Sequence, residues 1–263
     1  MSKQRIVITD GAYVVEGGIP LYQNAVGKSE DELCLEHRRM RQIPTGKGDY
    51  LLCRCGRSKT MPFCDYRHMT ESPKFEGPET ASRASYRERA QVYEGNGLKM
   101  YDDGRCAFVR LCHYDNRSVW NMSGTFDGEM KQEQINAAWH CPSGRLVVED
   151  AETGVVYEPE YEPSIIVLED VGLNCSGPLF VRGGVELVGE DGFVYETQNR
   201  YALCRCGKSM NKPFCDAMHH HEEAFDDGAI FHDGCVPSHE EWQSGADSAG
   251  KLDESFKKNA SEG

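Results

Sequence analysis

The chain lacks the features that mark several large classes of protein. None of its apolar runs approaches the roughly 18 residues of a membrane span, and the first residues, MSKQRIVITDGAY, contain no apolar signal-peptide core. Basic residues are scarce, because 29 Lys and Arg stand against 43 Asp and Glu, a formal net charge of −14. Nucleic-acid binders generally carry a basic face. We therefore expect a soluble, cytoplasmic protein that binds neither membranes nor nucleic acid.

The usual signatures of enzymes are also missing. The sequence contains no phosphate-binding glycine loop, no dinucleotide fingerprint and no nucleophile accompanied by a base. An autonomous enzyme is therefore not expected, and no residue is assigned as catalytic. What the sequence does contain is cysteine, at 12 of its 263 positions. A chain of this length can bury a core without disulfides, and grouped cysteines in a reducing compartment more often bind metal.

A repeat organises half of these cysteines. Residues 51–68 have the sequence LLCRCGRSKTMPFCDYRH, and residues 202–219 have the sequence ALCRCGKSMNKPFCDAMH. The shared spacing is C-x-C-x8-C-x3-H. It predicts two sets of four metal ligands: Cys53, Cys55, Cys64 and His68, and then Cys204, Cys206, Cys215 and His219.

This spacing predicts that each set divides into two pairs. In an extended segment residues i and i+2 point the same way, so the first two cysteines present their thiolates together. On a helix residues i and i+4 share a face, which brings the third cysteine and the histidine together. A [2Fe–2S] cluster needs two protein ligands on each iron, and two pairs match that demand. A structural zinc ion accepts the same ligand types and is the alternative.

The repeated unit resembles the motif of the CDGSH iron–sulfur (mitoNEET-like) family, C-x-C-x2-[ST]-x3-P-x-C-D-G-[SAT]-H. The resemblance implies that the eight residues above hold two [2Fe–2S] clusters. The glycine of the name-giving tetrapeptide is Tyr66 in the first copy and Ala217 in the second, which bears on how open each cluster is. Four further motif residues are expected to surround the ligands without binding metal: Ser58, Asp65, Ser209 and Asp216.

The histidine ligand has two consequences. A neutral imidazole in place of a thiolate makes the cluster less negative, so its reduction potential should exceed that of an all-cysteine ferredoxin. Histidine also titrates near neutral pH, so we predict clusters that become labile on mild acidification. Basic side chains near the sites should raise the potential further: Arg54, Arg57, Lys59 and Arg67, and Arg205, Lys208 and Lys212.

Three more cysteines lie between the copies, in RCAFVRLCHY and HCPSGRL. They are similar to the divergent single-cluster [4Fe–4S] ferredoxin-like domain that occurs fused to CDGSH modules. The resemblance implies a third cluster, [4Fe–4S] or [3Fe–4S], on Cys106, Cys112 and Cys141. A [4Fe–4S] cube wants four ligands, and the candidates for the fourth are His113, His140 and Cys175. The alternative is a domain whose buried cysteines bind nothing.

We predict a β-rich fold of the α+β class. Two CDGSH-type modules, each a small β-cap with a cluster-binding loop and helix, would stand in pseudo-two-fold relation, with a ferredoxin-like middle segment. In each module a strand, a Gly-Gly turn and another strand are predicted, at 11–21 and at 177–188. The predicted boundaries are 1–75 for the first module, 76–97 for a connecting arm, 98–170 for the middle segment, 171–237 for the second module and 238–263 for a disordered tail.

The first module carries an insertion around 27–45. The Gly-Gly pair and the first ligand cysteine are 36 residues apart in the first copy (17 to 53) and 21 apart in the second (183 to 204), a difference of 15. The stretch SEDELCLEHRRMRQ predicts a short charged helix with Ser29 as its N-cap. We assign no function to Cys34 in this insertion or to Cys235.

These features predict an iron–sulfur protein that acts in one-electron transfer or redox sensing, with redox proteins as partners. One alternative is storage of clusters or iron and their delivery to apo-proteins, which the same labile histidine would serve. The other is a structural zinc-binding interaction module. The chain could be a monomer with an internal pseudo-two-fold axis or a homodimer.

Overall fold

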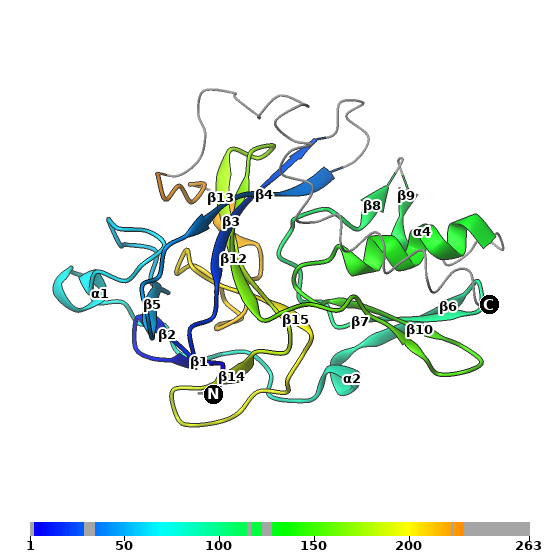
Figure 1. Cartoon of the computed structure of the whole chain (residues 1–263), viewed down its shortest axis with the longest axis horizontal. Coiled ribbons are helices and arrows are strands. Elements are labelled where there is room, and N and C mark those ends of the chain that lie inside the picture. Colours follow the sequence, from blue (N-terminus) through cyan, green and yellow to red (C-terminus); the bar gives the residue numbers. More distant parts are fainter. Residues whose placement is uncertain (1–2, 29–34, 115–116, 123–127, 222, 229–263) are drawn as a thin grey trace.

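The computed structural model describes residues 3–28, 35–114, 117–122, 128–221 and 223–228. Strands predominate over short helices in this part of the chain (Figure 1), which confirms the β-rich α+β class. No helix within these residues is long and apolar enough to cross a membrane. The predictions made for Ser29, Cys34, Cys235 and the tail 238–263 fall outside the described residues.

The two modules build two sheets jointly. One sheet has the order β14-β1-β2-β5, and all but its first strand come from the first module. The other has the order β15-β13-β12-β3-β4, and its last two strands come from the first module. The first module's strands are β1 (Arg5–Ile8), β2 (Ala12–Glu16), β3 (Leu21–Lys28), β4 (Leu35–Ile43) and β5 (Tyr50–Cys53). Their partners are β12 (Ser164–Asp170), at the end of the predicted middle segment, and three strands of the second module: β13 (Cys175–Arg182), β14 (Glu186–Val188) and β15 (Arg200–Leu203).

The predicted strand–turn–strand units are confirmed, and their glycines mark where the modules exchange strands. Gly17 and Gly18 join β2 to β3 with φ of 83° and 66°, and Gly183 and Gly184 join β13 to β14 with φ of 83° and 65°. Glycine adopts such angles without strain. After each pair the chain enters the other sheet, so that β3 runs parallel to β12 and β14 runs parallel to β1. Each module therefore completes the sheet of the other, in a pseudo-two-fold relation.

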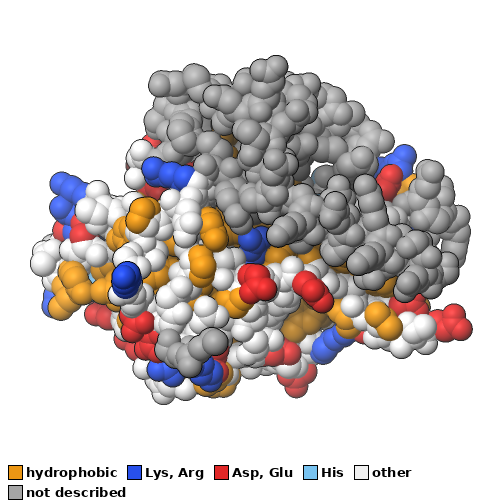
Figure 2. All heavy atoms as spheres, in the orientation of Figure 1, with side chains coloured by type: hydrophobic (Ala, Val, Ile, Leu, Met, Phe, Trp, Pro, Cys, Tyr) orange, Lys and Arg blue, Asp and Glu red, His pale blue; other side chains and the backbone are white. Residues whose placement is uncertain are grey.

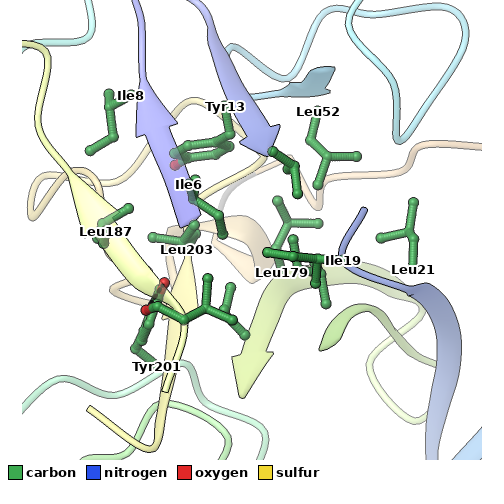
Figure 3. Packing of buried hydrophobic residues seen from close by; sticks show 14 of the residues in the cluster. Ile6, Ile8, Tyr13, Ile19, Leu21, Leu52, Leu179, Leu187, Tyr201 and Leu203 are labelled. Carbon is green, nitrogen blue, oxygen red and sulfur yellow. Dashed lines mark hydrogen bonds between the residues drawn. The ribbon is translucent and has the colours of Figure 1, made fainter. Parts of the chain in front are cut away.

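The strand exchange creates one hydrophobic core that both modules share. Ile6, Tyr13 and Leu52 of the first module pack with Leu187 and Leu203 of the second (Figure 3). None of these side chains is more than 3% exposed. Separating the modules would expose this apolar surface, at about 25 cal/mol per Å². We therefore expect the two modules to unfold together.

The insertion in the first module forms a strand, and the predicted charged helix is wrong. β4 pairs antiparallel with β3, with Gln42 opposite Tyr22. It lies at the edge of the five-stranded sheet, with no described strand paired to its outer side, and charged residues suit such an edge. Helix propensity is a weak local preference, and the pairing with β3 overrode it.

The middle segment forms a separate sheet of order β11-β10-β7-β6, against which α4 (Gly128–Trp139) packs. Its strands are β6 (Gln91–Gly95), β7 (Leu98–Asp102), β10 (Leu146–Asp150) and β11 (Val156–Tyr157). Four short elements complete this region: α2 (Tyr86–Arg89), β8 (His113–Tyr114), β9 (Arg117–Ser118) and α3 (Val119–Met122). The sheet begins at Gln91, inside the predicted connecting arm, and the exact domain boundaries stay predictions.

Candidate metal centres

The first two cysteines of each repeat lie at the end of a strand. Cys53 is the last residue of β5, and Cys204 directly follows β15. The sulfur atoms of Cys53 and Cys55 are 3.6 Å apart, and those of Cys204 and Cys206 are 3.7 Å apart. Each C-x-C unit therefore presents two sulfurs toward the same point, as the alternation of an extended chain requires.

The remaining two donors of each repeat form a second pair. Cys64 Sγ lies 3.7 Å from His68 Nδ1, and Cys215 Sγ lies 3.5 Å from His219 Nδ1. His68 belongs to α1 (Arg67–Thr70), and His219 belongs to the 3-10 turn η1 (Met218–His220). A single helical turn is therefore enough to bring the cysteine and the histidine together.

The same hydrogen bonds hold the loop between the donor pairs in both repeats. Ser58 and Ser209 each donate to the carbonyl five residues later, at 2.6 and 2.7 Å. Asp65 and Asp216 each accept from the backbone N–H six residues earlier, at 2.9 and 2.7 Å, and from the N–H two residues later, at 3.3 Å. These four side chains fix the shape of the loop that carries the ligands.

The two replacements of the motif glycine lie in the left-handed region. Tyr66 has φ of 63° and Ala217 has φ of 74°. Their backbone N–H groups donate to the sulfurs of Cys64 and Cys215, at 3.4 Å in both sites. A non-glycine residue held in this conformation is strained by roughly 1 kcal/mol or more. Both sites therefore keep the hydrogen bond to a ligand sulfur at some cost in stability.

Burial and hydrogen bonding shift the pKa values of the histidine and cysteine donors. His68 is 7% exposed and His219 is 3% exposed. Burial lowers the pKa of His219 to about 3, so the imidazole is neutral, as a metal ligand must be. In each cysteine pair the hydrogen bond between the two sulfurs lowers the pKa of one thiol, that of Cys53 to about 6 and that of Cys206 below its usual value. The same hydrogen bond raises the pKa of the partner thiols, Cys55 and Cys204. The thiolate, the form that binds metal, is therefore favoured at one cysteine of each pair.

The donors of each site fit a cluster with two irons. Two sulfurs bonded at about 2.3 Å to one tetrahedral metal lie about 3.8 Å apart, close to the 3.6 and 3.7 Å found here. Each site contains one such pair of sulfurs and one sulfur–nitrogen pair, which provides one pair for each iron. Within the described residues, no three His, Cys, Asp or Glu side chains gather closely enough to hold one metal ion.

The middle segment brings three cysteines together from two parts of the chain. Cys106 and Cys112 bound the loop that follows β7, and Cys141 precedes β10. β7 and β10 are paired, with Asp102 opposite Leu146, so these two parts lie side by side. Burial raises the pKa of Cys112 to about 12, and the nearby charges of Cys141 and Cys106 contribute to this. The three cysteines predicted for the third site therefore converge.

The backbone between Cys106 and Cys112 has two residues with positive φ. Phe108 has φ of 55° and Arg110 has φ of 67°, and the N–H of Phe108 donates to Cys106 Sγ at 3.3 Å. Segments that alternate between right- and left-handed residues form concavities of N–H groups that bind anions, iron–sulfur clusters among them. Neither residue is glycine, and such strain tends to occur at functional sites.

The three candidates for a fourth ligand lie in different surroundings. His113 Nδ1 is 3.4 Å from Cys112 Sγ. His140 Nδ1 is 2.6 Å from the carbonyl oxygen four residues earlier in α4. Cys175 begins β13, where burial and the charge of Asp170 raise its pKa to about 11. Of the three, His113 is the one whose ring contacts a predicted ligand.

One contact at the second site was not predicted from the sequence. His220 follows the ligand His219, and its position in a run of three histidines favours a surface location. In the structure the ring of Phe108 stacks on it, with 4.3 Å between ring centroids. No local signal relates residue 108 to residue 220, because the contact depends on how the middle segment packs against the second module.

Comparison with known proteins identifies the two repeated segments. The family model described as an iron-binding zinc finger of CDGSH type matches residues 10–69 and 176–220. These segments are CDGSH-type domains. Each contains all four donors of one site, and the description of the family agrees with iron binding at both. The middle segment lies outside the matched residues. No curated protein and no solved structure matches the chain.

Proposed function

We propose that this protein carries single electrons through two [2Fe–2S] clusters, one in each CDGSH domain. The observation that carries the proposal is the arrangement of the donors in two pairs per site, spaced as two ligands of one iron should be. When bound, such a cluster accepts and returns one electron. The chain supplies the thiolates, the neutral histidines and the loops that hold them.

We also propose a further cluster in the middle segment, on Cys106, Cys112 and Cys141. The two left-handed residues of the loop, Phe108 and Arg110, support this, because left-handed residues occur in the backbone concavities that bind anionic clusters. Three thiolates provide one ligand for each iron of a [3Fe–4S] cluster. A [4Fe–4S] cluster would need a fourth ligand for its fourth iron, for which His113, His140 and Cys175 are the candidates.

Delivery of clusters to apo-proteins is a second candidate, and one observation at the first site favours it. Tyr66 and Met69, on either side of His68 in sequence, are 53% and 62% exposed. Figure 2 shows exposed hydrophobic side chains at the end of the molecule where α1 lies. An acceptor protein could approach the labile histidine ligand from this side.

The content of iron, zinc and acid-labile sulfide in anaerobically purified protein tests these proposals. Two [2Fe–2S] clusters give about 4 iron and 4 sulfide per chain, and a further cluster raises iron to about 7 or 8. Reversible reduction by dithionite, followed by electron paramagnetic resonance, would support electron transfer. Zinc without sulfide would contradict all cluster-based functions. Cluster loss to an apo-ferredoxin that outpaces reoxidation would favour delivery.

A further inference from the structure

The two CDGSH sites differ in what covers the residue after the ligand histidine. In the first site this residue is Met69, which is 62% exposed. In the second site it is His220, on which the ring of Phe108 stacks at 4.3 Å. Phe108 belongs to the loop between Cys106 and Cys112. The loop of the middle site therefore contacts the residue after the ligand histidine in the second site, whereas the equivalent residue of the first site is exposed.

Other contacts join the middle loop to the second site. Three apolar residues of the loop share one buried cluster with Cys215: Ala107, Val109 and Leu111. The guanidinium carbon of Arg105 lies 3.7 Å from the ring centroid of Phe214, the residue before Cys215. The middle site and the second CDGSH site are thus neighbours.

The two CDGSH sites are also neighbours of each other. A Cβ atom placed on Gly56 would lie 2.2 Å from the carbonyl oxygen of Cys206, and one placed on Gly207 would lie 2.3 Å from that of Cys55. Met61 packs against the cysteine pairs of both sites. The three sites therefore follow the order middle, second, first, and Figure 1 shows the sheet of the middle segment and α1 at opposite ends of the molecule.

The arginine between the first two cysteines has different partners in the two sites. Arg54 and Arg205 are 0% and 1% exposed, and each guanidinium lies near a phenylalanine ring, at 5.9 and 5.3 Å. Within the described chain, the acceptors of Arg54 are backbone carbonyls and no carboxylate pairs with it. Arg205 pairs with Glu169 at 2.8 Å and also with Asp227. In the described chain, the buried arginine between the first two cysteines therefore has no carboxylate partner at the first site and two at the second.

This difference in charge should give the two CDGSH sites different reduction potentials. The net charge around an iron–sulfur cluster is one of the factors that set its reduction potential. An uncompensated positive charge favours the added electron, so the first site should have the higher potential. In the second site carboxylates offset the equivalent charge, and the electron is held less strongly.

We propose that the chain is a directional electron relay in which the second CDGSH site is internal and the first is the exit. One electron from a one-electron donor protein reduces the middle cluster, which on reoxidation reduces the second site. The second site in turn reduces the first, and a one-electron acceptor protein reoxidises the first at its open face. This proposal rests on the proposed electron-transfer function and adds the order and the direction.

The reduction potentials of the two sites test the direction. A dithionite titration followed by electron paramagnetic resonance should show the first site holding the electron at least about tenfold more strongly, which is 59 mV for one electron. The His68→Cys variant assigns the signals, because it alters the first site alone. Asp227→Asn removes one compensating charge and should raise the potential of the second site, whereas Asp226→Asn, at the exposed neighbouring residue, should not. Equal potentials, the reverse order or no effect of Asp227→Asn would overturn the relay.

The rate of iron loss to a chelator tests whether Phe108 restricts access to the second site. In the unaltered protein the first site should lose its iron at least about tenfold faster than the second, since burial slows access. Phe108→Ala should speed loss from the second site, whereas Met69→Ala, at the exposed residue of the first site that is equivalent to His220, should have little effect. Equal loss from both sites, or no effect of Phe108→Ala, contradicts an internal second site. If iron and sulfide are absent, or reduction is irreversible, the proposed electron transfer itself fails and the relay with it.

Discussion

The two CDGSH domains carry the same donors in nearly the same geometry and place them in different surroundings. Their cysteine pairs are 3.6 and 3.7 Å apart and their cysteine–histidine pairs 3.7 and 3.5 Å apart. Yet Met69 is exposed whereas the equivalent His220 lies under Phe108. The comparison teaches that the motif determines which donor atoms are brought together. Exposure and local charge depend on what packs around the motif.

The largest expected effect comes from breaking the contact between the two domains. Gly56→Ala forces a Cβ to within 2.2 Å of a backbone carbonyl of the other domain, at a residue with φ of 76°. We expect a loss of about 4 kcal/mol of unfolding free energy, from overpacking and left-handed strain together. Chemical denaturation measures it.

Gly46→Ala is the matched control for this contact. Gly46 has φ of 74°, but nothing lies within 4 Å of the Cβ that would be added. It should lose only about 1 kcal/mol, from strain alone. Equal losses in the two variants would show that the contact between the cysteine loops contributes nothing.

The second largest expected effect tests whether the middle segment unfolds separately from the two CDGSH domains. Asp102 accepts from Arg145 at 2.5 and 2.7 Å and from Trp120 at 3.0 Å. Burial raises the pKa of Asp102, but hydrogen bonds from Arg145 and Gly104 outweigh it and leave the pKa below its usual value. The ion pair therefore stabilises the fold above the unfolded-state pKa of about 3.9, and this contribution is lost as the pH falls below it.

Asp102→Asn should lower the stability of the middle segment by about 3 kcal/mol at pH 7 and by much less at pH 3. Urea unfolding followed by the fluorescence of Trp120 and Trp139 measures it. The iron content of the CDGSH domains should stay unchanged at pH 7. Parallel loss of that iron would mean that the middle segment and the domains unfold as one unit.

The third effect compares the two ligand histidines. His68→Cys and His219→Cys each replace a histidine ligand with a thiolate. The cluster of the first site should survive about tenfold longer at pH 5.5, and that of the second site should change less, because burial lowers the pKa of His219 to about 3. Loss of the visible absorption with time measures this. In the unaltered protein the open first site should be lost before the covered second site. Unchanged acid lability in both variants would show that the histidines are not responsible for it.

The smallest effect concerns the motif glycine. Tyr66→Gly removes the strain of a left-handed tyrosine and should stabilise the protein by about 1 kcal/mol, since Tyr66 is more than half exposed and loses little packing. Ala217→Gly should gain less, because Ala217 is 6% exposed and its methyl group is buried. Thermal unfolding measures both. A destabilised Tyr66→Gly would show that the tyrosine ring, not the backbone angle, matters at this position.

Local patterns predicted much of the fold and of the two main sites. The Gly-Gly pairs between strands were predictable because their turns need positive φ, and the donor pairs because ligand spacing is a property of a short segment. The strand β4 was missed because its charged sequence has no strand signal of its own and depends on pairing with β3. The cover formed by Phe108 was missed for a similar reason, since its partner is over 100 residues away.

The sequence by itself determined the eight donors of the CDGSH sites, their division into pairs and the repeat that places them twice in one chain. These properties depend on residues a few positions apart, whose relative directions follow from an extended segment or a single helical turn. Tertiary structure alone decided that the domains exchange strands, that Arg205 meets two carboxylates while Arg54 meets none in the described chain, and that the middle loop covers only the second site. Exposure and charge compensation arise from residues far apart in the chain, so the same motif acquires two different environments.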